Sequence, residues 1–199
     1  MNRKSLKTEL IQRLAALPSQ QAIFPQAEPN IDKIIQALEE INPIPQPLSS
    51  NNQSLIFGNW QLIYASNGTV VTRQVATIPD WMGFKIKQVY QTLTAGDSGI
   101  ATSNCAKIEL PLLGEWKIQA NGIWKCDRRS RAAERDEKTA LVSFDEFAFQ
   151  ATKPFNLPEL KIPVIEALRN EAVWITSYLD EEIRVGRGKT GNLFLFKRE

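Results

Sequence analysis

A chain of 199 residues with 43% hydrophobic side chains is long enough to fold around one sizeable core. Its 24 basic and 22 acidic side chains leave a net charge of +2, which argues against nucleic acid as a partner. The chain contains no histidine, which excludes histidine-based triads and the common zinc sites, so we expect no metal and no cofactor. We also expect no transmembrane segment and no signal peptide, because no apolar run is long enough for either.

Two helices are predicted first. Leucines recur at helical spacing from Leu6 until Pro18 ends the run. In the stretch 30–43, five isoleucine and leucine side chains share one stripe between Asn30, the expected N-cap, and Pro43. A linker rich in Pro, Ser and Asn follows. We therefore assign residues 1–50 to an N-terminal helical segment and linker, and residues 51–199 to a β domain.

The apolar period changes to two from Leu55 onward, which is typical of strands. About eight to ten strands are predicted at the spacing of a meander. A closed antiparallel barrel is favoured because it leaves no exposed sheet edge, and a sandwich is the alternative. The alternation slips at Asp145-Glu146, which indicates a bulge or a bend. We interpret "YLDEEIRV" as part of the penultimate strand, with Asp180, Glu182 and Arg184 on one face.

The tripeptide Gly188-Lys189-Thr190 is typical of the end of a phosphate-binding loop. Such a loop needs a further glycine five positions earlier, where this chain has Ile183, and a helix afterwards. The residues after Thr190 instead have the pattern of a strand. The sequence therefore predicts a turn between the last two strands, not a nucleotide site.

Four stretches together resemble the plastid-lipid-associated proteins, also called plant fibrillins: "IIQALEEINPIPQPL", "GNWQLIYAS", "VYQTL" and "SYLDEEIRVGRGKTGNLFLFKRE". The resemblance spans roughly 30–199 and implies a mainly β, lipocalin-like antiparallel barrel behind the N-terminal helical segment. It also implies a peripheral place on thylakoids or lipid globules, on the cytoplasmic side. Because the chain lacks a Ser- and Arg-rich plastid leader, we expect a cyanobacterial member.

The resemblance also implies roles for particular residues. Gly58 and Trp60 would close one end of the barrel, and Gly188 would serve the last turn. Either Arg184 or Arg187 would cover Trp60 through a cation–π contact, with Asp180 anchoring that arginine or lying near the ligand. From the residues alone, the acidic and basic side chains of this strand could equally form a row facing solvent.

Aromatic side chains are concentrated in the β domain, where simple core filling would account for most of them. A cavity for a lipid, quinone or carotenoid would account for the remainder. The residues expected to line it are Trp60, Tyr64, Trp81, Phe84, Tyr90, Trp116, Trp124, Phe144 and Phe147. The stretch 77–87 is the expected mouth, and its aromatics and lysines suit contact with a membrane surface.

Three functions remain open at this point. The favoured one is non-enzymatic binding or carriage of a hydrophobic small molecule. The second is a structural coat on lipid surfaces without a discrete ligand. The third is a lipid-modifying enzyme, for which Tyr64, Tyr90, Asp180 and Cys105 are candidate groups, although their spacing forms no recognised catalytic set. The sequence leaves the ligand's identity and the oligomeric state open.

Overall fold

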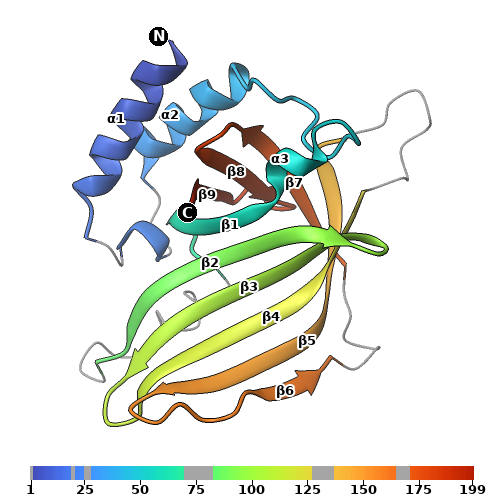
Figure 1. The fold of residues 1–199 in the computed structure, drawn as a ribbon. Coiled ribbons are helices and arrows are strands. Elements are labelled where there is room, and N and C mark those ends of the chain that lie inside the picture. The colour runs from blue at the N-terminus through green and yellow to red at the C-terminus, as the bar shows by residue number, and fades with distance from the viewer. Residues whose placement is uncertain (1, 19–20, 25–27, 70–82, 127–136, 165–170) are drawn as a thin grey trace.

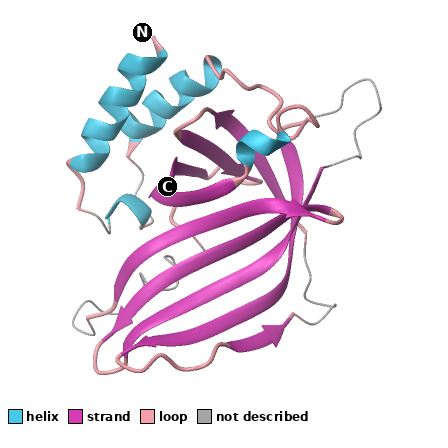
Figure 2. Cartoon of the chain, viewed as in Figure 1, coloured by secondary structure: helices cyan, strands magenta, loops and turns pink. Residues whose placement is uncertain are grey.

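The computed structural model describes residues 2–18, 21–24, 28–69, 83–126, 137–164 and 171–199. In these residues one antiparallel sheet of nine strands closes into a ring, and helices from the N-terminal segment lie against one side of it (Figure 1). Figure 2 shows how strongly strands dominate the chain. The prediction of a mainly β, barrel-like fold is confirmed, and the sandwich alternative is wrong.

The helical elements are α1 (Arg3–Ala15), the short 3-10 helix η1 (Gln21–Ile23), α2 (Pro29–Glu40) and α3 (Gln53–Ile56). The strands are β1 (Gly58–Ala65), β2 (Lys85–Gly96), β3 (Gly99–Leu110), β4 (Gly114–Cys126), β5 (Thr139–Lys153), β6 (Leu160–Pro163), β7 (Ala172–Leu179), β8 (Ile183–Gly188) and β9 (Leu193–Arg198). Within the described residues, no helix combines the length and apolar character needed to traverse a bilayer.

The strand order is β4-β3-β2-β1-β9-β8-β7-β5-β6, and pairing between β4 and β5 closes the ring. Strand β5 is shared between two neighbours: its first residues pair with β7 and its later residues pair with β6. The strands β2–β5 are much longer than β1 and β7–β9. They therefore continue beyond the short strands as a curved sheet with β6 at its edge (Figure 1).

Alternation along the strands separates two apolar layers. The inner layer fills the ring around Trp60, Leu93 and Trp124. The outer faces of β1 and β7–β9 are covered by α1 and α2, whose Leu10, Ile35 and Leu38 are fully buried there. Each such side chain contributes about 1.5–3 kcal/mol on burial. Helices and strands thus share a core, and the division near residue 50 stays a prediction.

Two details of the elements differ from the predictions. Helix α2 begins at Pro29 after Glu28, not after Asn30, because a proline at the first helical position loses no hydrogen bond. The stretch "YLDEEIRV" is a hairpin and not one strand, because the Asp180 carboxylate accepts hydrogen bonds from the backbone N–H groups of Glu182 and Ile183 and turns the chain.

The bulge predicted at Asp145-Glu146 is confirmed. Asn121 lies opposite Glu146 and Gly122 opposite Phe144, so Asp145 has no residue opposite it on β4. The turn predicted around Gly188-Lys189-Thr190 is confirmed as well, since it joins β8 to β9.

Candidate ligand-binding site

Cross-strand neighbours in the sheet identify which side chains face the interior, because paired residues project to the same side. One such row starts at the fully buried Trp60 and crosses the long strands to the edge strand β6. Its members are Trp60, Gln91, Asn104, Ala120, Phe147 and Ile162. Phe147 and Ile162 therefore lie on the inner surface, although they come after the part of β5 that pairs with β7.

The inner surface is dry at one end and exposed at the other. Trp60 and Leu93, near the short strands, are fully buried. In contrast, Phe147 is 39% exposed, Ile162 47% and Leu160 63%. We call the large inner-facing apolar side chains of β4–β6 that are not fully buried the open apolar face: Trp116, Ile118, Phe144, Phe147, Phe149, Leu160 and Ile162. Such a surface can take an apolar ligand without any rearrangement of the sheet.

The closed end of the ring is built around Trp60. Its indole N–H donates to the carbonyl of Ile56 at 2.8 Å, and two guanidinium groups lie over its ring. The guanidinium carbon of Arg184 is 5.0 Å from the ring centre, and that of Arg198 is 4.1 Å from it. Gly58 has φ +130°, and a Cβ there would lie 2.8 Å from Arg198 Nη1. These contacts close this end of the ring.

Arg184 is fully buried within the ring. Its guanidinium carbon also lies 5.5 Å from the ring centre of Trp124 and 4.5 Å from that of Phe196. Its Nη2 donates to the side-chain oxygen of Gln91 at 2.5 Å, and Gln91 in turn donates to Asn104 at 2.6 Å. Burial, together with repulsion from Arg198, lowers the pKa of Arg184 to about 9.

Arg187 and Asp180 serve the outer layer instead. Arg187 makes a two-pronged ion pair with Glu39 of α2, with Nε and Nη2 at 2.7 and 2.5 Å from the two carboxylate oxygens. Asp180 accepts from the Tyr178 hydroxyl and from Lys7 of α1. Burial alone would raise the pKa of Asp180, but these hydrogen bonds and those from the backbone lower it. The structure thus places Arg184, and not Arg187, over Trp60, and Asp180 neither anchors that arginine nor faces the interior.

Comparison with known proteins adds a second line of observation. Residues 4–197 match the PAP_fibrillin family. The chain belongs to that family. No solved structure matches it.

Three relatives of this PAP_fibrillin chain are plant proteins. It is 26% identical over 197 residues to the probable plastid-lipid-associated protein 5, chloroplastic, of Arabidopsis thaliana, covering 98% of this chain and 70% of the relative. It is 25% identical over 147 residues to protein 8 of the same series and species, covering 72% and 52% of the two chains. It is 24% identical over 196 residues to protein 3 of Oryza sativa subsp. japonica, covering 84% and 51%. This chain thus spans about half the length of the last two relatives.

In this PAP_fibrillin chain the expected ligand residues fall into three groups. The largest group is inner-facing: Trp60, Phe84, Trp116, Trp124, Phe144 and Phe147. Tyr64 and Tyr90 differ from the prediction and take no part in the open apolar face. Tyr64 lies under the helices, where its hydroxyl donates to Asp32 at 2.7 Å, and Tyr90 pairs with Gln61 and Cys105 on the outer side of the sheet. Trp81, with most of the expected mouth, lies outside the described residues.

The groups considered for catalysis do not converge. Tyr64 and Asp180 hold helices to the sheet, whereas Tyr90 and Cys105 are cross-strand neighbours. Burial raises the pKa of the Cys105 thiol, which makes it a poor nucleophile. Within the described residues, no three metal-ligating side chains gather at one point.

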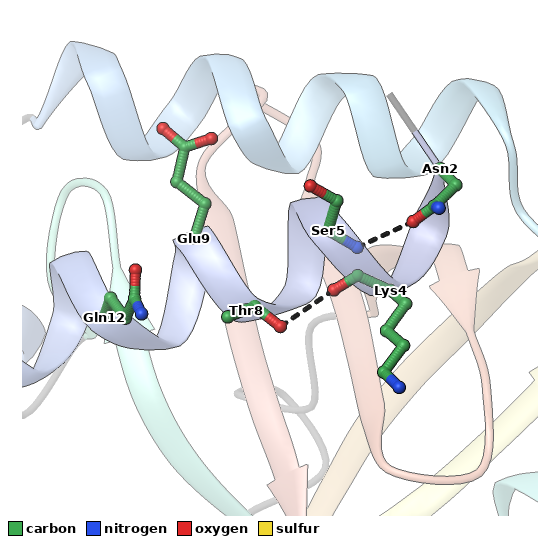
Figure 3. A pocket seen from close by; sticks show the side chains of 6 residues that line it. All are labelled: Asn2, Lys4, Ser5, Thr8, Glu9 and Gln12. Atoms are coloured by element: carbon green, nitrogen blue, oxygen red, sulfur yellow. Dashed lines mark hydrogen bonds between the residues drawn. The ribbon is translucent and has the colours of Figure 1, made fainter.

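Two hollows on the outer surface are unlike the open apolar face. Figure 3 shows one of about 520 Å³ along α1, and its lining is polar: Asn2, Lys4, Ser5, Thr8, Glu9 and Gln12. The other, of about 260 Å³, lies beside Thr92, Ser103 and Asn121 on the outer side of the sheet. The first lacks the apolar lining that an apolar ligand needs, and the second is lined by small and polar residues without one large apolar side chain.

Three residues of the interior were not among the predicted ones. Gln91 could have been predicted as a polar residue of the interior, because it stands between Val89 and Leu93 in the alternating pattern of inward-facing positions. Arg198 lacks any such signal, since a basic residue near the last strand's end is usually solvated. Trp174 packs against Trp124 with tilted rings whose centres are 5.7 Å apart, and only a glycine at 186 leaves room for its ring.

Proposed function

We propose that this protein binds an apolar small molecule, such as a lipid, quinone or carotenoid, against its open apolar face and does not transform it chemically. The observation that carries the proposal is the exposure of Phe147, Leu160 and Ile162 on the same surface that forms the core elsewhere. Covering this surface with a ligand would gain about 25 cal/mol for each Å² of apolar area removed from water. The names of the plant relatives, which describe plastid lipid association, agree with such a ligand.

We further propose that the protein works as a peripheral component of a lipid surface, such as a thylakoid or a lipid globule. Leu112 and Leu113, in the turn between β3 and β4, are strongly exposed, as are Phe155 and Leu157 after β5. These two segments are neighbours, because Glu115 pairs with Lys153 across the strands. We call these four residues the apolar tip.

Positive charge accompanies the apolar tip. The surrounding ranges 83–87, 107–117 and 153–163 carry six lysines and three glutamates. Apolar side chains at an exposed turn can enter the boundary between head groups and acyl chains, and nearby lysines are attracted to anionic head groups. The apolar tip would then place the open apolar face close to the lipid from which a ligand is drawn.

Ligand titration followed by tryptophan fluorescence tests the proposal. The panel contains a fatty acid, a short-chain quinone and a carotenoid. Trp116 reports binding because it lies on the open apolar face. We expect at least one to bind, and Phe147→Asp and Ile162→Asp to weaken its binding about tenfold or more, because each places a charge against the apolar ligand. The matched control is Ile11→Asp, on the exposed side of α1.

A coat protein without a discrete ligand is the second candidate, and the exposed apolar tip is the observation that favours it. If no member of the panel binds while the protein still floats with lipid vesicles, the coat replaces the carrier as the proposed function.

A further inference from the structure

The buried Arg184 has more hydrogen-bonding capacity than the described chain satisfies. Its Nη2 donates to Gln91, whereas Nε and Nη1 find no hydrogen-bond partner among the described residues. The side chain is fully buried, so solvent does not replace the missing acceptors. A buried guanidinium with two unsatisfied nitrogens is costly unless something else supplies the acceptors.

Other donors in the same interior share this condition. The indole N–H groups of Trp124 and Trp174 and the hydroxyl of Thr176 are buried, and none has a partner in the described part of the chain. The Trp124 ring lies 5.5 Å from the Arg184 guanidinium carbon, and the Trp174 ring centre lies 5.7 Å from that of Trp124. Arginine and tryptophan nitrogens can only donate, so donors outnumber acceptors among these unpaired groups.

The missing partner should also carry negative charge. No carboxylate of the described residues pairs with Arg184, and the second guanidinium, that of Arg198, adds to the positive potential. Burial and repulsion from Arg198 lower the pKa of Arg184, and no carboxylate of the described residues offsets them. An anionic acceptor would accept hydrogen bonds from the unsatisfied nitrogens and would also compensate the positive charge.

The position of the cluster defines how a ligand would lie. Gln91, which binds Arg184, belongs to the same inner row as Phe147, with only Asn104 and Ala120 between them. A head group at Arg184 would therefore leave its chain pointing along small side chains toward the open apolar face. The ligand that matches this arrangement is an amphiphile.

We propose that the interior binds an amphiphile with an anionic head group, a carboxylate or a phosphate, whose oxygens accept hydrogen bonds from Arg184 and the neighbouring indole N–H groups while its apolar chain covers the open apolar face. The inference rests on the proposed function and deepens it. The packing of Arg184 on Trp60 and the recognition of an anion are compatible, because the ring contacts use the guanidinium face and the hydrogen bonds use its edge.

The test compares ligands that differ only in the head group: laurate, dodecyl phosphate and dodecanol, titrated at pH 7.5 by isothermal calorimetry. We expect laurate or dodecyl phosphate to bind about tenfold to a hundredfold more tightly than dodecanol, the range expected for hydrogen bonds to a buried charge. Whichever anion binds more tightly identifies the head group. This comparison needs no variant and so does not depend on how a substitution folds.

A variant series then assigns the effect to Arg184. Arg184→Met keeps a long side chain without charge. We expect it to remove the preference for the anionic ligands, because it weakens their binding while dodecanol still binds. Arg13→Met, on the exposed surface of α1, controls for general attraction of anions and should leave the preference intact.

Equal binding of all three ligands would overturn this inference and leave the proposed function standing. Binding of none of the three would overturn this inference, and it would overturn the proposed function as well only if the quinone and the carotenoid of the first panel also fail to bind. A preference that survives Arg184→Met would also overturn the inference.

Discussion

Arg198 holds the closed end of the ring together through three backbone carbonyls. Its Nη1 donates to the carbonyl of Phe57 at 2.7 Å, its Nη2 to that of Leu55 at 2.5 Å and its Nε to that of Glu181 at 2.9 Å. The same guanidinium stacks on Trp60. One side chain of the last strand thus joins α3, the start of β1 and the turn between β7 and β8.

Replacing this residue gives a direct prediction. We expect Arg198→Ala to lower the free energy of unfolding by about 2 kcal/mol, because three carbonyls lose a charged donor and Trp60 loses one of its two covers. Urea denaturation measures the change. Lys197→Ala, at the exposed neighbouring position, is the control and should remain within about 0.5 kcal/mol of the original protein. A loss no larger than that of the control would contradict this role.

A family resemblance identified Trp60 and narrowed its cover to Arg184 or Arg187, and the alternation of the strands places most of the aromatic residues on the inner face. It could not place Tyr64 and Tyr90, whose hydroxyl groups suit either side of a sheet. The partner that decides the side for Tyr64 is Asp32, which comes from a helix 32 residues earlier. Such long-range hydrogen bonds leave no local pattern in a sequence.

Among the elements, the turn between β7 and β8 is fixed by Asp180. Its carboxylate accepts from two backbone N–H groups, from Tyr178 and from Lys7, and so ties α1 to the sheet. Local charge alternation suggested a continuous strand here, because an aspartate that caps a turn and one that faces solvent look alike in sequence.

The lowered pKa of Asp180 predicts a pH dependence of stability. Because its folded-state pKa lies below the ordinary value of 3.8, its contribution is complete above that pH and is lost as the pH falls through the folded-state pKa. We expect Asp180→Asn to cost about 1–2 kcal/mol at pH 7 and progressively less below about pH 4. Urea denaturation across pH 2–7, with the exposed Glu181→Gln as control, measures the difference. A cost that does not change with pH would contradict the assignment.

Helix α2 is attached to β8 by the pair between Arg187 and Glu39. The pair is mostly buried, with side chains 25% and 15% exposed, and its geometry is two-pronged. A double-mutant cycle of Arg187→Met and Glu39→Gln should give a coupling energy of about 1 kcal/mol or more. The control cycle uses Arg13 and Glu9, an exposed pair on α1, where we expect about 0.3–0.5 kcal/mol. Equal coupling in the two cycles would show that Arg187 does not act as a clamp.

The apolar periods predicted the two helices and the closed sheet. They did not predict where α2 begins, which Pro29 determines. They also did not predict that β7 and β8 are separate strands, which results from the backbone hydrogen bonds that the Asp180 side chain accepts. These are local hydrogen-bonding effects that an apolar period does not report. The sharing of β5 between β6 and β7 was also beyond reach, because strand pairing over such distances depends on the whole sheet.

At the scale of the whole molecule, the ring has a plugged end and an exposed apolar end, and the apolar tip lies with the long strands. We expect the double variant Leu112→Asp with Phe155→Asp to reduce flotation with phosphatidylglycerol vesicles about tenfold or more, since two apolar anchors become charged. Ile41→Asp, at the end of α2, is the control and should float as the original protein does. Unchanged flotation of the double variant would exclude the apolar tip as the lipid contact.

The central claim is that the open apolar face holds an apolar small molecule. Native mass spectrometry of protein purified gently from a photosynthetic host, with solvent extraction of what accompanies it, tests this most directly. We expect one apolar or amphiphilic small molecule in stoichiometric amount, lost from the Phe147→Asp variant. Protein that arrives empty, and then takes up no fatty acid, quinone or carotenoid, would contradict it.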